Sequence, residues 1–209
     1  MVMGIYFSAL SITPEVHAQQ APTVRTTFAE VGMGLGKSEF YGRLEVDDEA
    51  RDALGFSPNL GGTLSIAFYQ RAGWASKRLY LGGRFKVQIA TPTSGDGPEE
   101  YFFNQYYGAL TARMYPRSDY RTGLYLQMDV TYGQFTEKLR NPNTNSADHQ
   151  FAVGPGVLGG IGYAIPVGGE RRLNLQFYVQ RNVGNGDVNG EGEVQFDYGA
   201  LGGEVILSF

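Results

Sequence analysis

The hydrophobic and polar positions of this chain alternate with a period of two. Between Leu79 and Ile89 the odd positions are apolar apart from one glycine, whereas the even positions carry tyrosine, arginine, lysine and glutamine around another glycine. The segments 124–132 and 173–180 alternate in the same way. Since successive side chains of a strand point to opposite faces, each segment predicts a β-strand with one apolar and one polar face. Each approaches the roughly 9–11 residues that a tilted strand needs to cross a bilayer.

Weaker runs of the same kind raise the number of predicted strands to about eight, an even number that suits a closed up-and-down antiparallel barrel. The predicted strands cover residues 24–36, 61–71, 78–90, 102–115, 122–135, 150–165, 172–183 and 194–209. The connections between them are expected to alternate between long and short. The long ones, 37–60, 91–101, 136–149 and 184–193, are predicted as extracellular loops, and the short ones, 72–77, 116–121 and 166–171, as periplasmic turns. Both termini are therefore expected on the periplasmic side.

Alternation alone does not say which face lies outside, because a soluble lipocalin-like barrel encloses its apolar residues. In this chain the polar face is mostly tyrosine, glutamine, asparagine, threonine and glycine, with few charges. A water-facing surface usually carries many more lysines and glutamates, so this face is interpreted as a packed lumen. The predicted class is an all-β transmembrane barrel, and the soluble barrel stays as the alternative.

Aromatic residues near the strand ends predict two girdles at the two membrane interfaces. The loop-side girdle is expected to contain Tyr101, Phe102, Phe103, Tyr132, Phe135, Phe151, Phe196 and Tyr198. The turn-side girdle is expected to contain Tyr115, Tyr120, Tyr163 and Phe209.

Length and composition narrow the other possibilities. A chain of 209 residues suits one domain, and the absence of cysteine excludes disulfides and thiolate metal sites. No apolar stretch reaches the roughly 18 residues of a transmembrane helix, so a helical membrane protein is excluded. The net charge of -4 gives no indication of nucleic-acid binding, and no cofactor is expected.

The first residues are typical of a secretory signal peptide. An apolar run between Met1 and Ile12 precedes Val16-His-Ala18, which resembles a small-x-small site, and cleavage is expected after Ala18. No lysine or arginine comes before Arg25, so the basic start of a signal is missing from this sequence. A buried first strand is the alternative. The expected division is a signal peptide at 1–18 and a barrel domain at 19–209.

The C-terminal segment from Leu201 to Phe209 alternates up to a terminal aromatic residue. With the strand pattern, it resembles the small porin-like outer-membrane barrels of the OmpA/OmpX type, over nearly the whole mature chain. The resemblance implies an assembly signal formed by Val205, Leu207 and Phe209, which the outer-membrane assembly machinery would recognise. It also implies a monomer in the outer membrane of a Gram-negative bacterium, in contact with membrane lipid and lipopolysaccharide.

Charged residues in phase with the polar face are the candidates for a site inside the barrel. They are Glu30, Arg84, Lys86, Arg113, Asp129 and Glu204. An eight-stranded barrel is only just wide enough for its own side chains, so these groups are expected to pair and fill the lumen. A narrow or gated pore is the alternative.

Catalytic signals are weak. His149 lies beside Asp148 and Ser146, which would allow acid/base chemistry, but a solvated loop histidine explains it as well. The string Gly154-Pro-Gly-Val-Leu-Gly159 fits a dinucleotide-binding motif, yet its continuation is strand-like and no helix follows, so we interpret it as a chance match.

The predicted loops are acidic. They contain Glu45, Asp47, Asp48, Glu49 and Asp52, then Asp96, Glu99 and Glu100, and finally Asp187, Glu191 and Glu193. No spacing completes a calcium loop, so a solvated surface is favoured over divalent ions bridging to lipopolysaccharide. Residues 47–55 predict one or two helical turns.

The leading function is a structural or surface-interaction barrel that works through its loops, with no enzymatic activity and an unknown extracellular ligand. A small pore ranks second and a lipid-active enzyme third.

Overall fold

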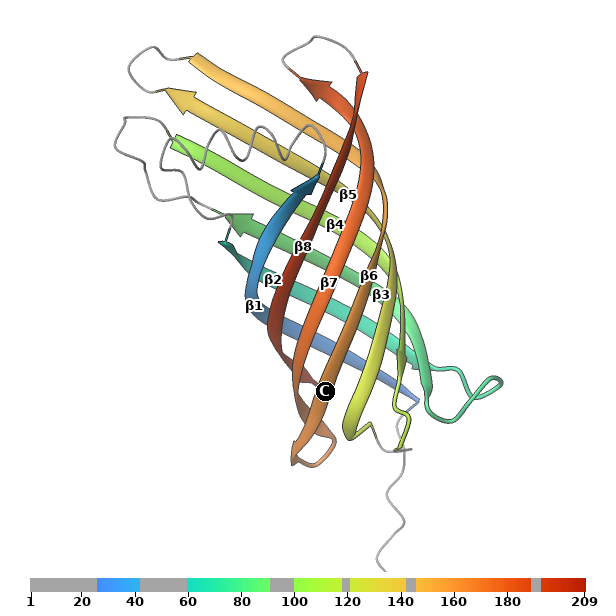
Figure 1. The fold of residues 1–209 in the computed structure, drawn as a ribbon. Helices are drawn as coiled ribbons and strands as arrows, with labels where there is room; N and C mark the ends of the chain where they lie inside the picture. Colours follow the sequence, from blue (N-terminus) through green and yellow to red (C-terminus); the bar gives the residue numbers. More distant parts are fainter. Residues whose placement is uncertain (1–25, 42–59, 91–99, 118–120, 142–145, 189–192) are drawn as a thin grey trace, which may run out of the picture.

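A computed structural model of the chain describes residues 26–41, 60–90, 100–117, 121–141, 146–188 and 193–209. These residues form eight strands that close into one barrel in chain order (Figure 1). The strands are β1 (Thr27–Tyr41), β2 (Leu60–Arg71), β3 (Leu79–Ala90), β4 (Glu100–Met114), β5 (Gly123–Asn141), β6 (Ser146–Gly168), β7 (Arg171–Val188) and β8 (Glu193–Ser208). Helices are absent from the described ranges, and none there could span a membrane. The all-β up-and-down barrel predicted from the sequence is confirmed.

Antiparallel pairing joins each strand to the next and β8 back to β1. The closing ladder runs from Glu30 opposite Ser208 to Tyr41 opposite Asp197. Closure leaves no strand with an unpaired edge, which is what a β-structure needs where no water can satisfy its backbone. The start of β1 and the end of β8 consequently meet at the same rim, which also carries the turns between β2 and β3, between β4 and β5 and between β6 and β7 (Figure 1). We call this the turn-side rim, and the opposite one the loop-side rim.

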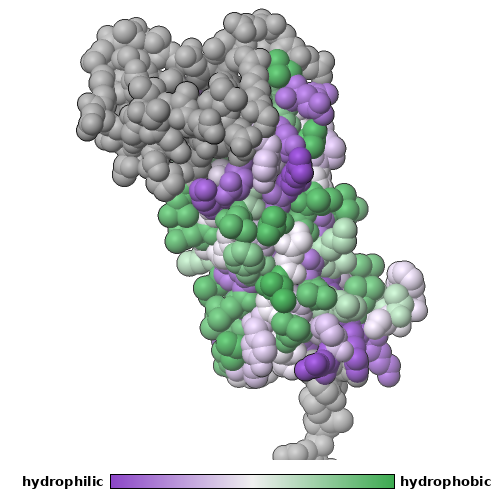
Figure 2. Space-filling view, viewed as in Figure 1, coloured by the Kyte–Doolittle hydropathy of each residue, from purple (hydrophilic) through white to green (hydrophobic). Residues whose placement is uncertain are grey.

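The alternation of the sequence becomes an apolar outside and a polar inside. On β5, Met128 is 61% exposed, whereas the next residue, Asp129, is fully buried. On the visible face of the barrel, hydrophobic residues cover the middle, with hydrophilic residues above and below them (Figure 2). Apolar surface of this extent is costly in water and favourable in lipid. The arrangement is that of a transmembrane barrel and the reverse of a lipocalin-like one.

Several strands continue beyond the expected ends on the loop side. β5 runs to Asn141 and β6 begins at Ser146, while β7 and β8 pair as far as Asp187 opposite Glu193. The prediction of long loops at 136–149 and 184–193 is therefore wrong. The apolar alternation ends where the lipid ends, but backbone pairing does not need an apolar face and carries on above it. The segments 42–59 and 91–99 remain as the longer connections.

Five of the ten predicted girdle residues whose side chains are described lie inside the barrel instead. Phe103, Phe135, Phe196, Tyr198 and Tyr115 are at most 1% exposed. Each is in phase with the polar positions of its strand, as Phe135 is with Asp129, and phase decides the face more strongly than nearness to a strand end. The remaining described members face outward, namely Phe102, Tyr132, Phe151, Tyr163 and Phe209. Tyr101 and Tyr120 lie outside the residues whose side chains are described.

Small residues make the inner face of β6 unusually flat. The inward positions of this strand are Ala152, Gly154, Gly156, Leu158, Gly160, Gly162 and Ala164. A Cβ atom at Gly162 would collide with the ring of Tyr125, and one at Gly160 would lie 2.7 Å from Nε2 of Gln176. The glycine string between Gly154 and Gly159 thus lies within a strand, where it makes room for larger neighbours.

The apolar belt generates the first prediction. Met128→Arg places a charge at the middle of the outward face of β5, and we expect it to lower the free energy of unfolding by about 2–4 kcal/mol. The matched control is Gln134→Arg on the same strand, also exposed but beyond the apolar residues, where we expect about 0–1 kcal/mol. Urea titration of the barrel in lipid vesicles measures both. Equal losses in the free energy of unfolding at the two positions would contradict the assignment of the apolar belt to the lipid-facing surface.

Candidate functional site

The lumen is built from three layers of side chains. A turn-side aromatic layer contains Phe28, Tyr69, Tyr80, Tyr115 and Tyr125. A loop-side aromatic layer contains Phe103, Phe135, Phe196 and Tyr198. Between these two layers lie the six charged residues that the sequence singled out, with Tyr107 and Tyr178 beside them.

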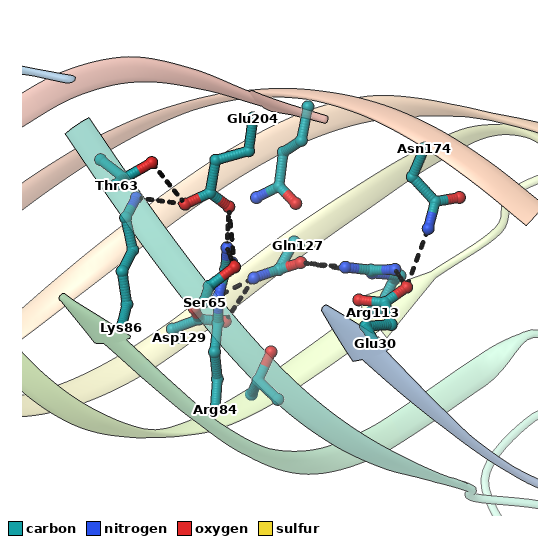
Figure 3. Close-up of polar contacts among 12 residues, drawn as sticks. Glu30, Thr63, Ser65, Arg84, Lys86, Arg113, Gln127, Asp129, Asn174 and Glu204 are labelled. Atoms are coloured by element: carbon teal, nitrogen blue, oxygen red, sulfur yellow. Dashed lines mark hydrogen bonds and ion pairs between the residues drawn. The ribbon is translucent and has the colours of Figure 1, made fainter. Parts of the chain in front are cut away.

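Glu204 on β8 is the centre of the first charged cluster (Figure 3). Its carboxylate pairs with Arg84 on β3 and, at 2.9 Å, with Nζ of Lys86 on the same strand. The hydroxyls of Thr63 and Ser65 on β2 also donate to it, each at 3.4 Å. Two cations and two hydroxyls therefore surround one buried carboxylate, which supplies the compensation that a buried charge requires.

Asp129 extends this cluster towards β5. Its Oδ2 lies 3.7 Å from Nη1 of Arg84, so the arginine bridges two carboxylates. The ammonium of Lys86 also lies 3.0 Å from the centre of the Tyr178 ring, a cation–π contact in a water-poor setting.

Arg113 on β4 is the centre of the second cluster, nearer the turn-side rim. It forms an ion pair with Glu30 and donates to Oε1 of Gln127 through Nε at 3.2 Å and Nη2 at 2.7 Å. Its guanidinium lies between the rings of Tyr69 and Tyr125, at 4.7 and 4.3 Å from their centres. Such planar stacking and forked donation are properties of arginine that lysine lacks.

Gln127 connects the two clusters. It accepts from Arg113 and donates through Nε2 to both oxygens of Asp129 at 3.0 Å. Asn174 completes the second cluster by donating to Oε1 of Glu30 at 2.9 Å. All six charged residues are consequently part of one connected polar network.

The charges of this network balance. Three cations face three carboxylates, and none of the six residues is more than 5% exposed. Side chains this well covered fill the middle of the lumen. The arrangement can hold a barrel together, and none of its six charged side chains is exposed as an acid/base group.

The turn-side rim has its own closing residue, Arg121. Its backbone adopts a positive φ of 56°, which is uncommon for a residue with a side chain. The guanidinium lies 4.3 Å from the ring centre of Phe28 and donates, at 3.3 Å each, to Oγ of Ser208 and to the carbonyl of Glu170. Arg121 thus links the start of β1, the end of β8 and the turn between β6 and β7.

Sequence analysis missed several of these residues. Arg121 carries no periodic signal because it lies in a turn. Gln127, Asn174, Thr63 and Ser65, in contrast, share the phase of the charged residues on their strands. Their phase places them on the lumen face. They carry no charge, however, and the predicted site contained only charged residues.

Other sequence-based candidates are placed only in part. The backbone of Ser146, Asp148 and His149 lies at the start of β6, but their side chains are outside the described residues. So are the side chains of the acidic residues of the predicted loops, the possible helical turns at 47–55 and the signal segment 1–18. Within the described part of the chain, no three histidine or acidic side chains are grouped as metal ligands would be.

The proposed assembly-signal residues lie on the closing strand. Val205, Leu207 and Phe209 all face outward and are 37–47% exposed. This places them on the lipid-facing side of β8 next to β1, which is compatible with recognition before closure.

Comparison with known proteins adds a likeness of fold. No protein-family model and no curated protein sequence matches the chain. Among solved structures, Neisserial surface protein A is 14% identical with a TM-score of 0.50, over 88% of this chain and 98% of that one. Ail, the attachment invasion locus protein of Yersinia pestis, is 8% identical with a TM-score of 0.51, over 87% and 99%. The same protein in complex with the heparin analogue sucrose octasulfate gives 7% and 0.51. The fold of this chain is that of the small outer-membrane barrels, as the resemblance implied.

The second prediction tests the network through its most self-contained pair. Arg113→Met leaves Glu30 buried without its cation, and we expect a loss of about 3–5 kcal/mol in the free energy of unfolding. Glu30→Met should lower the free energy of unfolding by a similar amount, because it leaves Arg113 buried without its carboxylate partner. The double variant should lose clearly less than the sum of the two, because no buried charge is left uncompensated.

The control for this cycle is an exposed ion pair on the outer wall. Arg181 and Asp197 form a bidentate pair at 3.0 and 2.5 Å, and Arg181 is 61% exposed. Arg181→Met should therefore lower the free energy of unfolding far less than either lumen variant, because exposed ion pairs contribute little to stability. Urea titrations in vesicles measure all four variants. Strict additivity of the lumen pair would show that the two side chains are not coupled.

Proposed function

We propose that this chain is an integral protein of a bacterial outer membrane with a non-catalytic, surface-interaction role. The observation that carries the proposal is the sealed lumen. The balanced network is enclosed by an aromatic layer on each side, so the interior serves as a structural core. A barrel with a filled interior acts through what it presents outside the membrane.

The loop-side rim is the part of the molecule suited to that role. The longer connections, 42–59 and 91–99, join strands at this end. On the outer wall just below it, polar residues replace the apolar belt: Lys37 pairs with Glu39 at 3.2 Å, and Arg181 pairs with Asp197. These ion pairs mark the upper limit of the lipid-facing surface and lie where lipopolysaccharide headgroups would contact the barrel.

The names of the similar structures support the same role. One is a surface protein and the other an attachment protein that has been crystallised with a heparin analogue. The charge of the present chain favours a different ligand, since segment 42–59 contains five acidic residues and two arginines. We therefore propose a cationic partner surface and not a sulfated polysaccharide.

The assembly signal and the leader segment belong to the same proposal. Val205, Leu207 and Phe209 form an outward row on the last strand, which supports a role in recognition by the assembly machinery. Removal of residues 1–18 on export would leave the barrel domain at 19–209.

The third prediction concerns conductance. The refolded chain in a planar bilayer should give no discrete current steps, because the charged network and both aromatic layers obstruct the lumen. A heat-dependent shift in gel mobility shows that the sample is folded. Reproducible steps from folded protein would overturn the sealed lumen and make a pore the leading function.

The fourth prediction concerns the charge of the loops. A fluorescent lysine-rich peptide should bind the refolded chain at low salt, and binding should weaken as salt screens the charges. Glu45→Gln, Asp47→Asn, Asp48→Asn, Glu49→Gln and Asp52→Asn introduced together should reduce the affinity at least several-fold. Sucrose octasulfate is the control ligand and should not bind. Binding of the sulfated sugar in place of the peptide would contradict a cationic partner.

A further inference from the structure

The turn-side rim carries an unexplained excess of positive charge. Its basic residues are Arg71, Lys77, Arg78, Arg117, Arg121, Arg171 and Arg172, whereas Glu170 is the one acidic residue among the described residues of the rim. Asp119 belongs to the same region of the sequence but lies outside the described residues. Because the lumen network is neutral by itself, it does not compensate this excess.

Hydrogen bonds to backbone carbonyls hold several of these side chains along the rim. Nε of Arg71 donates to the carbonyl of Lys77 at 2.9 Å, and Nη1 of Arg78 donates to that of Pro116 at 2.7 Å. Nη1 of Arg172 donates to the carbonyl of Gly169 at 3.1 Å. A carbonyl orients a guanidinium without cancelling its charge, so Arg71 and Arg172 keep their positive charge at the rim.

The basic residues directly follow the apolar belt. Arg71 ends β2 three residues after Phe68, which is 62% exposed on the outer wall. A groove of about 520 Å³ at the turn between β6 and β7 places Arg171 beside Val167 and Phe209, and Glu170 lines the same groove. Hydrophilic residues lie below the hydrophobic band at this end of the barrel (Figure 2). This is the depth at which lipid headgroups meet the protein.

An exposed tryptophan lies at the same level. Trp74, the single tryptophan of the chain, is 86% exposed in the turn between β2 and β3. The turn is held by hydrogen bonds from the amides of Ala75 and Ser76 to the carbonyl of Ala72, both at 2.9 Å. It projects sideways from the barrel (Figure 1). Tryptophan side chains favour the headgroup region, where an apolar ring and its N–H group are both satisfied.

We propose that the turn-side rim is a binding collar for anionic phospholipid headgroups in the leaflet that it faces. The inference rests on the proposed membrane insertion and adds a lipid preference at the end opposite the loops. Positive charge next to an apolar wall fits a headgroup phosphate whose acyl chains lie along that wall. A soluble anionic polymer would match the charge alone and would leave the groove between Arg171, Val167 and Phe209 unexplained.

The position of the single tryptophan allows a direct test. The refolded chain is placed in two preparations of phosphatidylcholine vesicles. One contains phosphatidylglycerol with brominated acyl chains, and the other contains the same mole fraction of phosphatidylcholine with brominated acyl chains. Bromine quenches nearby tryptophan, so the emission of Trp74 reports which lipid collects at the rim. We expect about two- to fivefold enrichment of the anionic lipid. Both leaflets have the same composition, so the direction of insertion does not affect the result.

Two charge variants make the test specific. Lys77→Gln, Arg117→Gln and Arg171→Gln together remove three exposed charges from the rim and should lower the enrichment of the anionic lipid at least twofold. Lys37→Gln, Lys138→Gln and Arg181→Gln remove three charges from the loop side and should leave it unchanged.

Each remaining outcome overturns the proposal in a distinguishable way. Equal quenching by both brominated lipids shows that the barrel is inserted but that the rim has no headgroup preference. Absence of quenching by either lipid overturns both the collar and the proposed membrane insertion. A change in Trp74 emission on adding peptidoglycan fragments in neutral detergent, without any lipid preference, would assign the rim to an anionic polymer.

Discussion

The requirement that every backbone N–H and C=O group be bonded within the protein underlies the whole structure. Lipid cannot satisfy these groups, so a sheet that crosses a membrane has to close on itself. Here the closing ladder between β1 and β8 meets that condition. Closure at eight strands then fixes the size of the interior, which leaves space for side chains but little else. The filled lumen is thus a consequence of strand number.

A filled polar interior has to satisfy its own charges. The chain does so by surrounding Glu204 and Arg113 with partners from several strands, so that distant parts of the sequence depend on one another. The small residues of β6 contribute by leaving space on one side of the lumen for the larger side chains of β5 and β7. The stability of the barrel, the filling of its lumen and the size of the residues on each strand therefore depend on one another.

The fold could be predicted from the sequence because lipid imposes a strict period of two on the residues inside the membrane. The same period identified the six charged lumen residues. It did not locate the ends of β5 to β8, where strands pair in water without apolar alternation. Aromatic character near strand ends wrongly predicted Phe103, Phe135, Phe196 and Tyr198 at the membrane interface, whereas the period of two places them inside. The partners of each charge depend on the register between strands, which a single sequence does not reveal.

Because β5 and β6 continue beyond the apolar belt, the protein extends past the lipid-facing part of the barrel on the loop side. From Tyr132, the last outward aromatic residue of β5, to Asn141 the strand extends roughly 30 Å at the usual rise per residue. A paired hairpin of this length is stiff, unlike a loop of the same number of residues. The paired strands would extend beyond the apolar belt, so that a large partner could meet the protein without approaching the bilayer itself.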